Sequence, residues 1–339
     1  CGDLHLENFG SYKGDNRLVY FDLNDFDEAL LAPATLDLVR FLCSVLVAAP
    51  DMGVGRKDAR ALGGAFLDAY LATLAAGRAG WVERDTAEGL IRSLLAGLHG
   101  RLRPAFLDGR TELKGKHRRL RLDNGKALPV TDTQREHVAT LIGGLAGSHA
   151  DPDFFEVLDV ARRIAGNGSV GVDRYVLLVR GKGSPDGNEL LDLKEALPSA
   201  VLPRVATPQP VWRSEAERVV AIQRRMQAAP MAFLQPLRWR KRSYMLRALQ
   251  PSEDRVSLDA ADSGVGALKG VLTHMGAIVA SAQLRSGGRD GSAIADTLIG
   301  FAGAVRRKAL LGAAQDCAEQ LRKDWKTFAE ACDDGEFDL

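Results

Sequence analysis

The sequence contains little cysteine and no long hydrophobic run. Its four cysteines, in 339 residues, form no CxxC pair and are too few for a disulfide scaffold. The most apolar stretch, residues 41–49, is much shorter than the ~20 residues that a membrane span requires. No basic region followed by an apolar core marks a signal peptide. We therefore expect a cytoplasmic protein with reduced thiols, no structural zinc and no membrane partner.

A surplus of charge of either sign is also absent. Lys and Arg number 45 and Asp and Glu number 44, which leaves a net charge of +1. This balance gives no general attraction to nucleic acid or to an anionic membrane. With 46% apolar residues the chain has a globular composition. Because single cores stop growing near roughly 250–300 residues, we expect two lobes with a cleft between them.

The spacing of apolar residues divides the chain into three parts. A spacing of three and four predicts helices over 35–49, 56–76, 84–108, 133–147 and 268–285. Alternation predicts antiparallel strands over 157–165, 172–179, 190–195 and 243–249, with a helix over 214–227 between the last two. We expect a small β-rich lobe formed by 151–250, and a larger, mainly helical lobe formed by 1–150 and 251–339.

Acidic and amide side chains are concentrated in two segments near the start of the chain. Residues 1–10 read CGDLHLENFG and residues 24–29 read NDFDEA, with one predicted strand between them. Oxygen atoms of Asp3, Asn8 and the carboxylates that follow would suit a hard cation such as Mg²⁺. One or two protein carboxylates suffice, because Mg²⁺ keeps water and phosphate oxygens in its shell. The alternative is that Asp and Asn occupy turns, where they bond to nearby amides.

A glycine-rich segment and a lysine distinguish the middle part. Gly166, Gly168 and Gly171 form a GxGxxG pattern that includes Ser169 and lies between two predicted strands. A dinucleotide-binding fold would continue into a helix, whereas a strand follows here, which fits a glycine hairpin over a triphosphate. A tight hairpin without a ligand is the alternative. Lys194, on the next strand among Leu and Ala, requires an anion if it points inward.

Lys194 has two candidate acidic partners on the helix predicted to begin at Ser214. Glu215 lies on the same stripe as the apolar residues of that helix. Glu217 occupies the third helical position, where the capping-box spacing already gives it a role. An inward-pointing Lys194 could therefore pair with Glu215 or with Glu217, and a solvent-facing lysine remains the alternative.

These features resemble the protein-kinase-like superfamily, most closely aminoglycoside phosphotransferases and related small-molecule kinases. The catalytic loop of these enzymes reads HGDxHxxN, which the segment GDLHLEN matches, with Cys1 in place of the first histidine. Their magnesium loop reads roughly IDFDDA, which the segment DFDEA at 25–29 matches. The resemblance implies an ATP- and Mg²⁺-dependent phosphotransferase with a nucleotide and an unknown acceptor as its partners.

The resemblance also implies roles for individual residues. Asp3 would be the catalytic base, and Asn8 and Asp25 would hold Mg²⁺, with Asp22 as a rival to Asp25. Lys194 would bind the phosphates of ATP. The segment that covers those phosphates would contribute Gly166, Gly168, Ser169 and Gly171.

The order of the motifs differs from that of an ordinary kinase. The glycine segment and Lys194 follow the catalytic loop instead of preceding it, as in a circular permutation, which a fold tolerates. This order, with the segments GDLHLENFG, FDLNDFDEA, GNGSVG and LKEA, is similar over nearly the whole chain to the bacterial family called domain of unknown function 2252 (DUF2252). Members usually continue before the first loop, so we expect an N-terminal segment to be missing here.

We therefore expect an α+β, two-lobed protein-kinase-like fold with circularly permuted connectivity. Three alternative functions remain open. The first is an ATP-binding pseudokinase that acts as a scaffold, which the Cys1 substitution favours. The second is a nucleotidyl (AMP) transferase with the nucleotide reversed in the same cleft. The third, a metal-dependent hydrolase, leaves the glycine segment and Lys194 unexplained.

Overall fold

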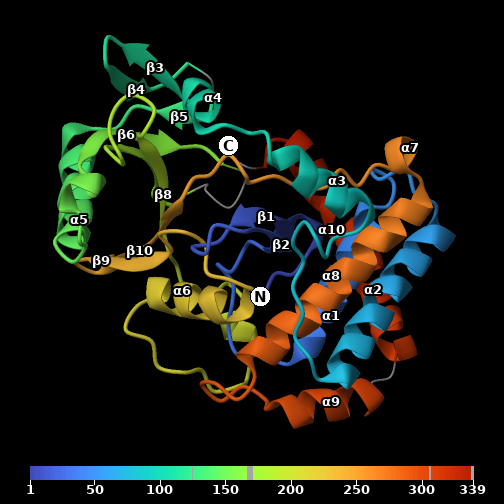
Figure 1. Cartoon of the computed structure of the whole chain (residues 1–339). Coiled ribbons are helices and arrows are strands. Elements are labelled where there is room, and N and C mark those ends of the chain that lie inside the picture. The colour runs from blue at the N-terminus through green and yellow to red at the C-terminus, as the bar shows by residue number, and fades with distance from the viewer. Residues whose placement is uncertain (124, 166–170, 305–306, 337–339) are drawn as a thin grey trace.

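The computed structural model describes residues 1–339 except 124, 166–170, 305–306 and 337–339 (Figure 1). The fold is mixed α+β. A sheet-containing part and a helical part stand side by side, and a short hairpin lies between them (Figure 1). The expectation of an α+β chain with small antiparallel sheets is confirmed at this level.

The main sheet has six strands, all antiparallel to their neighbours, in the order β5-β6-β7-β8-β10-β9. They are β5 (Ala127–Leu128), β6 (Val157–Arg163), β7 (Arg174–Val179), β8 (Glu189–Glu195), β9 (Gln235–Trp239) and β10 (Arg242–Ala248). Alternation within β8 sends Leu191 and Leu193 into the apolar core beside α5. Asp192 and Lys194 consequently face the opposite side, which is the side of the cleft.

The face of the sheet that carries Leu191 is covered by α5 (Asp132–Ala146), whose Ile142 and Leu141 are buried there. The helix α4 (Arg103–Asp108) and the hairpin of β3 (Thr111–Lys114) and β4 (His117–Leu120) lie at the sheet edge formed by β5 and β6 (Figure 1). The helices and strands from α4 to α5 therefore pack with the sheet, although we expected them in the helical part. Their apolar residues pack against the strands. The periodicity of the sequence does not predict these contacts, because they join segments that are distant along the chain.

The helical part is built around α8 (Val265–Ser286), which packs against α2 (Arg56–Ala76). Gly276 makes this approach close, because a Cβ there would lie 2.1 Å from the carbonyl oxygen of Phe66. Apart from the helix after β8, which is described below, the other described helices of the chain are η1 (Leu6–Asn8), α1 (Ala34–Ala48), α3 (Gly89–Leu98), η2 (Pro152–Phe155), η4 (Leu202–Arg204), α7 (Ala260–Ser263), α9 (Ala295–Ala304) and α10 (Arg307–Asp333). By length and composition α8 passes for a membrane span, but 56% of its most apolar window is buried, as in a core helix.

The hairpin of β1 (Phe9–Lys13) and β2 (Val19–Leu23) joins the two parts. Its β1 strand is bonded to the connection that follows β10: the Ser11 amide donates to the Asp254 carbonyl at 2.8 Å, and the Lys13 amide donates to Oε1 of Gln250 at 2.6 Å. The segments before and after this hairpin are the two acidic loops. The fold thus delivers both loops to the cleft beside the sheet.

The helix α6 (Glu215–Met226) follows β8 and packs against β10 and α8. Ser214 caps it, since its hydroxyl accepts a hydrogen bond from the Glu217 amide at 3.2 Å, as the sequence predicts. The helix therefore contacts both parts of the molecule.

Candidate functional site

Two adjoining cavities lie between the acidic loops and the sheet. The smaller, of about 180 Å³, is lined by Asp3, Asn8, Asp25, Asp27 and Lys194, among others. The larger, of about 760 Å³, shares these five residues and extends along the sheet. Four residues that we singled out from the sequence, Asp3, Asn8, Asp25 and Lys194, therefore line one cleft although 191 positions separate the first from the last.

The first loop is fixed at its start by a close backbone approach. Gly2 has a φ of +89° and passes against the carbonyl of Glu28, where a Cβ would lie 2.0 Å from the oxygen. Only glycine fits both the torsion and the contact. The Gly2 amide also donates to Oδ1 of Asp37 at 2.9 Å, which ties the loop to the first turn of α1.

Asp3 is oriented by a cation. The Nε atom of Arg40, on α1, donates to Oδ1 of Asp3 at 2.8 Å, and the Asp3 side chain stays 47% exposed toward the cleft. The His5 ring bonds through Nδ1 to the carbonyl of Asp3 at 3.0 Å and so orders the loop. The His5 amide donates to Oδ1 of Asn8 at 2.5 Å. Arg40 was not identified from the sequence.

The two acidic loops are bonded to each other. The Asn24 amide donates to the Asn8 carbonyl at 2.8 Å. This bond fixes the register of the loop that carries Asp25 and Asp27 against the loop that carries Asn8. Oxygen atoms from both loops consequently face one cavity.

Lys194 pairs with Asp27. Neither of its two candidate partners on α6 holds this place: the Glu215 carboxylate accepts from Nε of Arg218 at 2.6 Å, and Glu217 accepts from the Arg213 amide at 2.7 Å. The reason is the direction of β8, which aims Lys194 at the second acidic loop, while the acids of α6 are satisfied locally.

Asp27 lies in an environment with an excess of negative charge. Burial raises the pKa of its carboxyl and the nearby Asp25 carboxylate raises it further, while the Lys194 ammonium and the Arg247 guanidinium only partly oppose them. Asp25 and Asp27 thus repel each other, and Lys194 forms its ion pair with Asp27. An additional cation would relieve this repulsion.

Asp22, which we considered as a rival metal ligand, does not line either cavity. It is 3% exposed, and its carboxylate accepts from the amides of Leu23 at 2.8 Å and Ala228 at 2.9 Å. Burial raises the pKa of the Asp22 carboxyl, and the charge of Arg285 and these two bonds oppose the rise. Its bonds give it a structural role that joins β2 to the segment after α6.

The donor set fits magnesium better than a metal that requires a complete protein cage. Among the described residues, no group of three or more His, Cys, Asp or Glu side chains could hold a metal ion. Asn8 and Asp25 instead offer two oxygen donors on loops that are bonded to each other. This small set suits Mg²⁺, which retains water and phosphate ligands.

The predicted glycine segment is described only at its end. Gly166, Gly168 and Ser169 lie outside the described residues. Gly171 has a φ of +75°, a conformation that favours glycine, and the next residue, Val172, lines the smaller cavity.

A cluster of arginines lies farther along the cleft, and the sequence analysis did not identify it. Asp192 is 1% exposed, and Arg174 grips its carboxylate with two bonds, at 3.0 and 2.7 Å. Arg163 lies 2.7 Å and Arg247 3.2 Å from the same carboxylate. Burial alone would raise the pKa of Asp192, but these three charges outweigh burial and hold it well below its usual range.

The cleft therefore has two ends. We call the part lined by Asp3, Asn8, Asp25 and Asp27 the carboxylate end, and the part lined by Arg163, Arg174 and Arg247 around Asp192 the arginine end. Lys194 lies between them. One signal for the arginine end was present in the sequence, because alternation in β8 places Asp192 and Lys194 on the same face.

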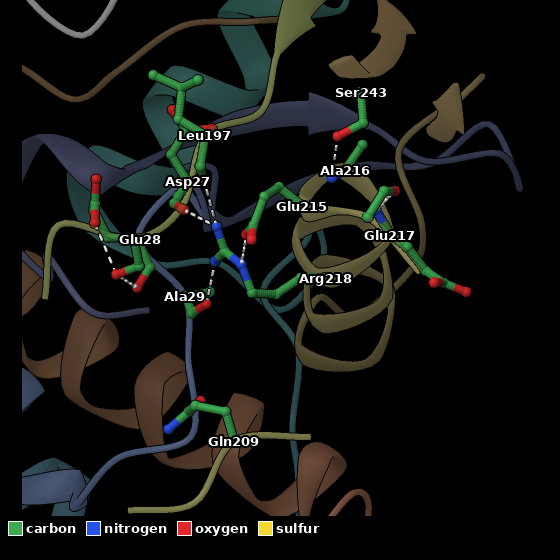
Figure 2. Close-up of polar contacts among 12 residues, drawn as sticks. Asp27, Glu28, Ala29, Leu197, Gln209, Glu215, Ala216, Glu217, Arg218 and Ser243 are labelled. Atoms are coloured by element: carbon green, nitrogen blue, oxygen red, sulfur yellow. Dashed lines mark hydrogen bonds and ion pairs between the residues drawn. The ribbon is translucent and has the colours of Figure 1, made fainter. Parts of the chain in front are cut away.

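Arg218 of α6 holds the backbone of the carboxylate end in place (Figure 2). Its guanidinium donates to the carbonyls of Asp27 and Leu197, both at 2.9 Å, and to that of Ala29, while Glu215 pairs with it from the preceding turn. Only 7% of the Arg218 side chain is exposed. The position of α6 therefore sets the position of the loop that carries Asp25.

Comparison with known proteins gives one match. A family model described as "Uncharacterized protein conserved in bacteria (DUF2252)" covers residues 1–331. No curated protein and no solved structure matches the chain. The matched range includes every residue of both ends of the cleft.

Proposed function

The chain belongs to the bacterial DUF2252 family, and we propose that it is a kinase-like, ATP- and Mg²⁺-dependent phosphotransferase, which moves a phosphorus-containing group from ATP to an acceptor in the cytoplasm. The observation that carries the proposal is the cleft itself. Two oxygen-rich loops and a buried lysine from a distant strand face the same cavity. This combination matches the needs of a metal-bound triphosphate, which requires both cation ligands and a cation of its own.

The order of elements in the sheet also supports a kinase-like cleft. Two antiparallel strands, β6 and β7, flank the glycine segment, Lys194 follows on β8, and α6 comes next. Protein kinases place their lysine on the third strand and an acidic helix after it. The chain departs from that pattern in one respect, because Lys194 pairs with Asp27 and not with an acid of α6.

Each residue at the carboxylate end has a defined task in this proposal. Asp3, oriented by Arg40, accepts the proton of an acceptor hydroxyl. Lys194 exchanges the Asp27 carboxylate for phosphate oxygens. Asn8 and Asp25 would hold Mg²⁺, which neutralises phosphate charge. Positioning and charge neutralisation supply most of the rate enhancement in such reactions.

Calorimetric titration of Mg²⁺-ATP into the wild type and into Lys194→Ala tests the proposal. We expect micromolar binding that weakens by about tenfold or more in the variant. Lys241→Ala is the matched control, since this lysine is exposed in the turn between β9 and β10. Equal affinity in the wild type and Lys194→Ala, or no binding at all, would refute the proposal. ATP binding without any product would instead indicate a scaffold.

A further inference from the structure

The arginine end carries more positive charge than its own carboxylate can neutralise. Three guanidinium groups surround Asp192. The next acid, Glu253, also lines the larger cavity, and its Oε1 atom has no hydrogen-bond partner within the part of the chain that the structure describes. Burial raises the pKa of the Glu253 carboxyl, and the charges of Arg247 and Arg163 only partly offset this effect. An anion bound at this end would be stabilised by the positive charge that these carboxylates leave unneutralised.

One of these arginines is a direct neighbour of Lys194 in the sheet, and another is a direct neighbour of Asp192. Arg174 on β7 is the cross-strand partner of Lys194, and Arg247 on β10 is the cross-strand partner of Asp192. Directly opposed side chains lie roughly 5 Å apart at Cβ. A phosphate chain bound by Lys194 therefore lies beside Arg174, in the cavity that Arg163 and Arg247 also line.

The two ends of the cleft differ in the sign of their charge. At the carboxylate end, Asp3, Asp25 and Asp27 have Lys194 and Arg40 as cationic partners. At the arginine end the guanidiniums predominate. Arginine binds phosphate oxygens with paired, charge-assisted hydrogen bonds, whereas a purine base and its ribose are uncharged. The most negative part of ATP, its terminal phosphates, is thus favoured at the arginine end.

Resting on the proposed function, we propose that Arg163, Arg174 and Arg247 bind the β- and γ-phosphates of ATP, so that the α-phosphorus faces Asp3 and the transferred group is AMP. An oxygen of the acceptor hydroxyl forms a bond to the α-phosphorus. The bond from that phosphorus to the bridging oxygen of the β-phosphate breaks, and pyrophosphate leaves with the electron pair. The hydroxyl proton passes to Asp3.

The test compares the two halves of the nucleotide as separate ligands. Pyrophosphate and AMP are titrated, each with Mg²⁺, into the wild type and into Arg163→Gln. Arg163 is the most exposed of the three arginines, at 21%, and its loss leaves Arg174 and Arg247 on Asp192. Arg162→Gln is the control, because Arg162 is the exposed neighbour on the same strand and points to the other face.

We expect Arg163→Gln to weaken pyrophosphate binding by about tenfold and to change AMP binding by less than about twofold. Arg163→Lys, which keeps the charge, recovers part of the loss, and Arg162→Gln changes neither affinity. Unchanged pyrophosphate affinity in Arg163→Gln, or a loss confined to AMP, would overturn the inference, since either result places the phosphates away from the arginines.

The products of wild-type turnover give a second, independent result. ³¹P NMR of a reaction with ATP, with water or an added alcohol as acceptor, should show AMP transfer and pyrophosphate. ADP as the product would overturn this inference but leave the proposed function standing. Failure of ATP to bind would overturn the proposed function itself, so the two failures are distinguishable.

Discussion

The carboxylate end and the arginine end hold buried charge in opposite ways. The carboxylate end is built from two loops, fixed by backbone bonds such as that from Asn24 to Asn8, and its three acids have two ion-pair partners, Arg40 and Lys194. The arginine end is built from side chains on neighbouring strands, and its central acid, Asp192, is saturated with cations. One end lacks positive charge and the other lacks negative charge. A complex of a divalent cation with a triphosphate supplies both.

Replacing Asp192 should disrupt the arginine end and give the largest loss of stability among the substitutions proposed here. In Asp192→Asn the three guanidiniums lose their shared anion, and such removal of one member of a buried ion pair costs about 3–5 kcal/mol. Urea denaturation of the variant measures the free energy of unfolding. The exposed Asp316→Asn is the control and should stay within ~0.5 kcal/mol of the wild type. A loss no larger than that of the control would contradict the role given to Asp192.

The pH dependence of this loss has a defined sign. The pKa of Asp192 is lowered on folding, so its stabilising contribution is complete above the unfolded pKa of about 3.9 and is lost as the pH falls through the lower folded value. The difference in unfolding free energy between the wild type and Asp192→Asn should therefore be constant from about pH 5 to pH 8 and shrink in stronger acid. A difference that grows below pH 4 would contradict the lowered pKa.

Asp25→Ala should break the carboxylate end without unfolding the protein. Removal of this exposed carboxylate takes away one of two proposed magnesium donors, and we expect the Mg²⁺-dependent part of ATP affinity to fall by roughly tenfold to a hundredfold. Titration with Mg²⁺ and with EDTA measures that part, and circular dichroism checks the fold. Asp15→Ala, at the exposed β1–β2 turn, serves as the control. Unchanged Mg²⁺ dependence in Asp25→Ala would show that Asp25 is not a magnesium ligand.

Arg218→Met should weaken the anchoring of the carboxylate end and leave the structure of the arginine end unchanged. The variant frees the carbonyls of Asp27, Ala29 and Leu197, so the loop that carries Asp25 loses its anchor to α6 (Figure 2). We expect a several-fold loss of ATP affinity with Mg²⁺, on the order of 1 kcal/mol, and little change with EDTA. Arg218→Lys should recover part of the affinity. Equal losses in both buffers would show that Arg218 supports the whole fold and not one end.

Asp27→Asn should have the smallest effect and the opposite sign. The change releases Lys194 from its ion pair and removes a neighbour that repels Asp25. ATP affinity in EDTA should rise by about twofold to fivefold, because the Lys194 ammonium no longer has to leave the Asp27 carboxylate before it binds phosphate. A titration in EDTA measures it. Weaker binding in that buffer would mean that the Asp27–Lys194 pair positions the lysine for phosphate.

The local elements and the first acidic loops could be predicted from sequence because their signals are local. Periodicity gave α2 at residues 56–76 with both bounds as observed, and the Ser214 cap was read from the spacing of Ser214 and Glu217. The expected helix over 84–108 proved to be α3 and α4, with Gly100 and Pro104 near the break. Asp3, Asn8 and Asp25 were found because they occupy short, recognisable segments.

The arginine end and the partner of Lys194 could not be predicted, because both depend on pairing between distant strands and loops. Arg163, Arg174, Asp192 and Arg247 come from four strands, and only the sheet order brings them together. Glu215 lies at a suitable position on α6, but its carboxylate pairs with Arg218 on the same helix. This local contact costs less chain entropy than a contact with the distant Lys194. Packing of α5 on the sheet was missed for the same reason.

The most direct test of the account is ATP titration into the wild type and Asp25→Ala, each with Mg²⁺ and with EDTA. Mg²⁺ should strengthen wild-type binding by at least about tenfold, and Asp25→Ala should retain the weaker EDTA affinity but gain little from Mg²⁺. Identical wild-type affinities in the two buffers would contradict the claim that this cleft binds a magnesium–triphosphate complex.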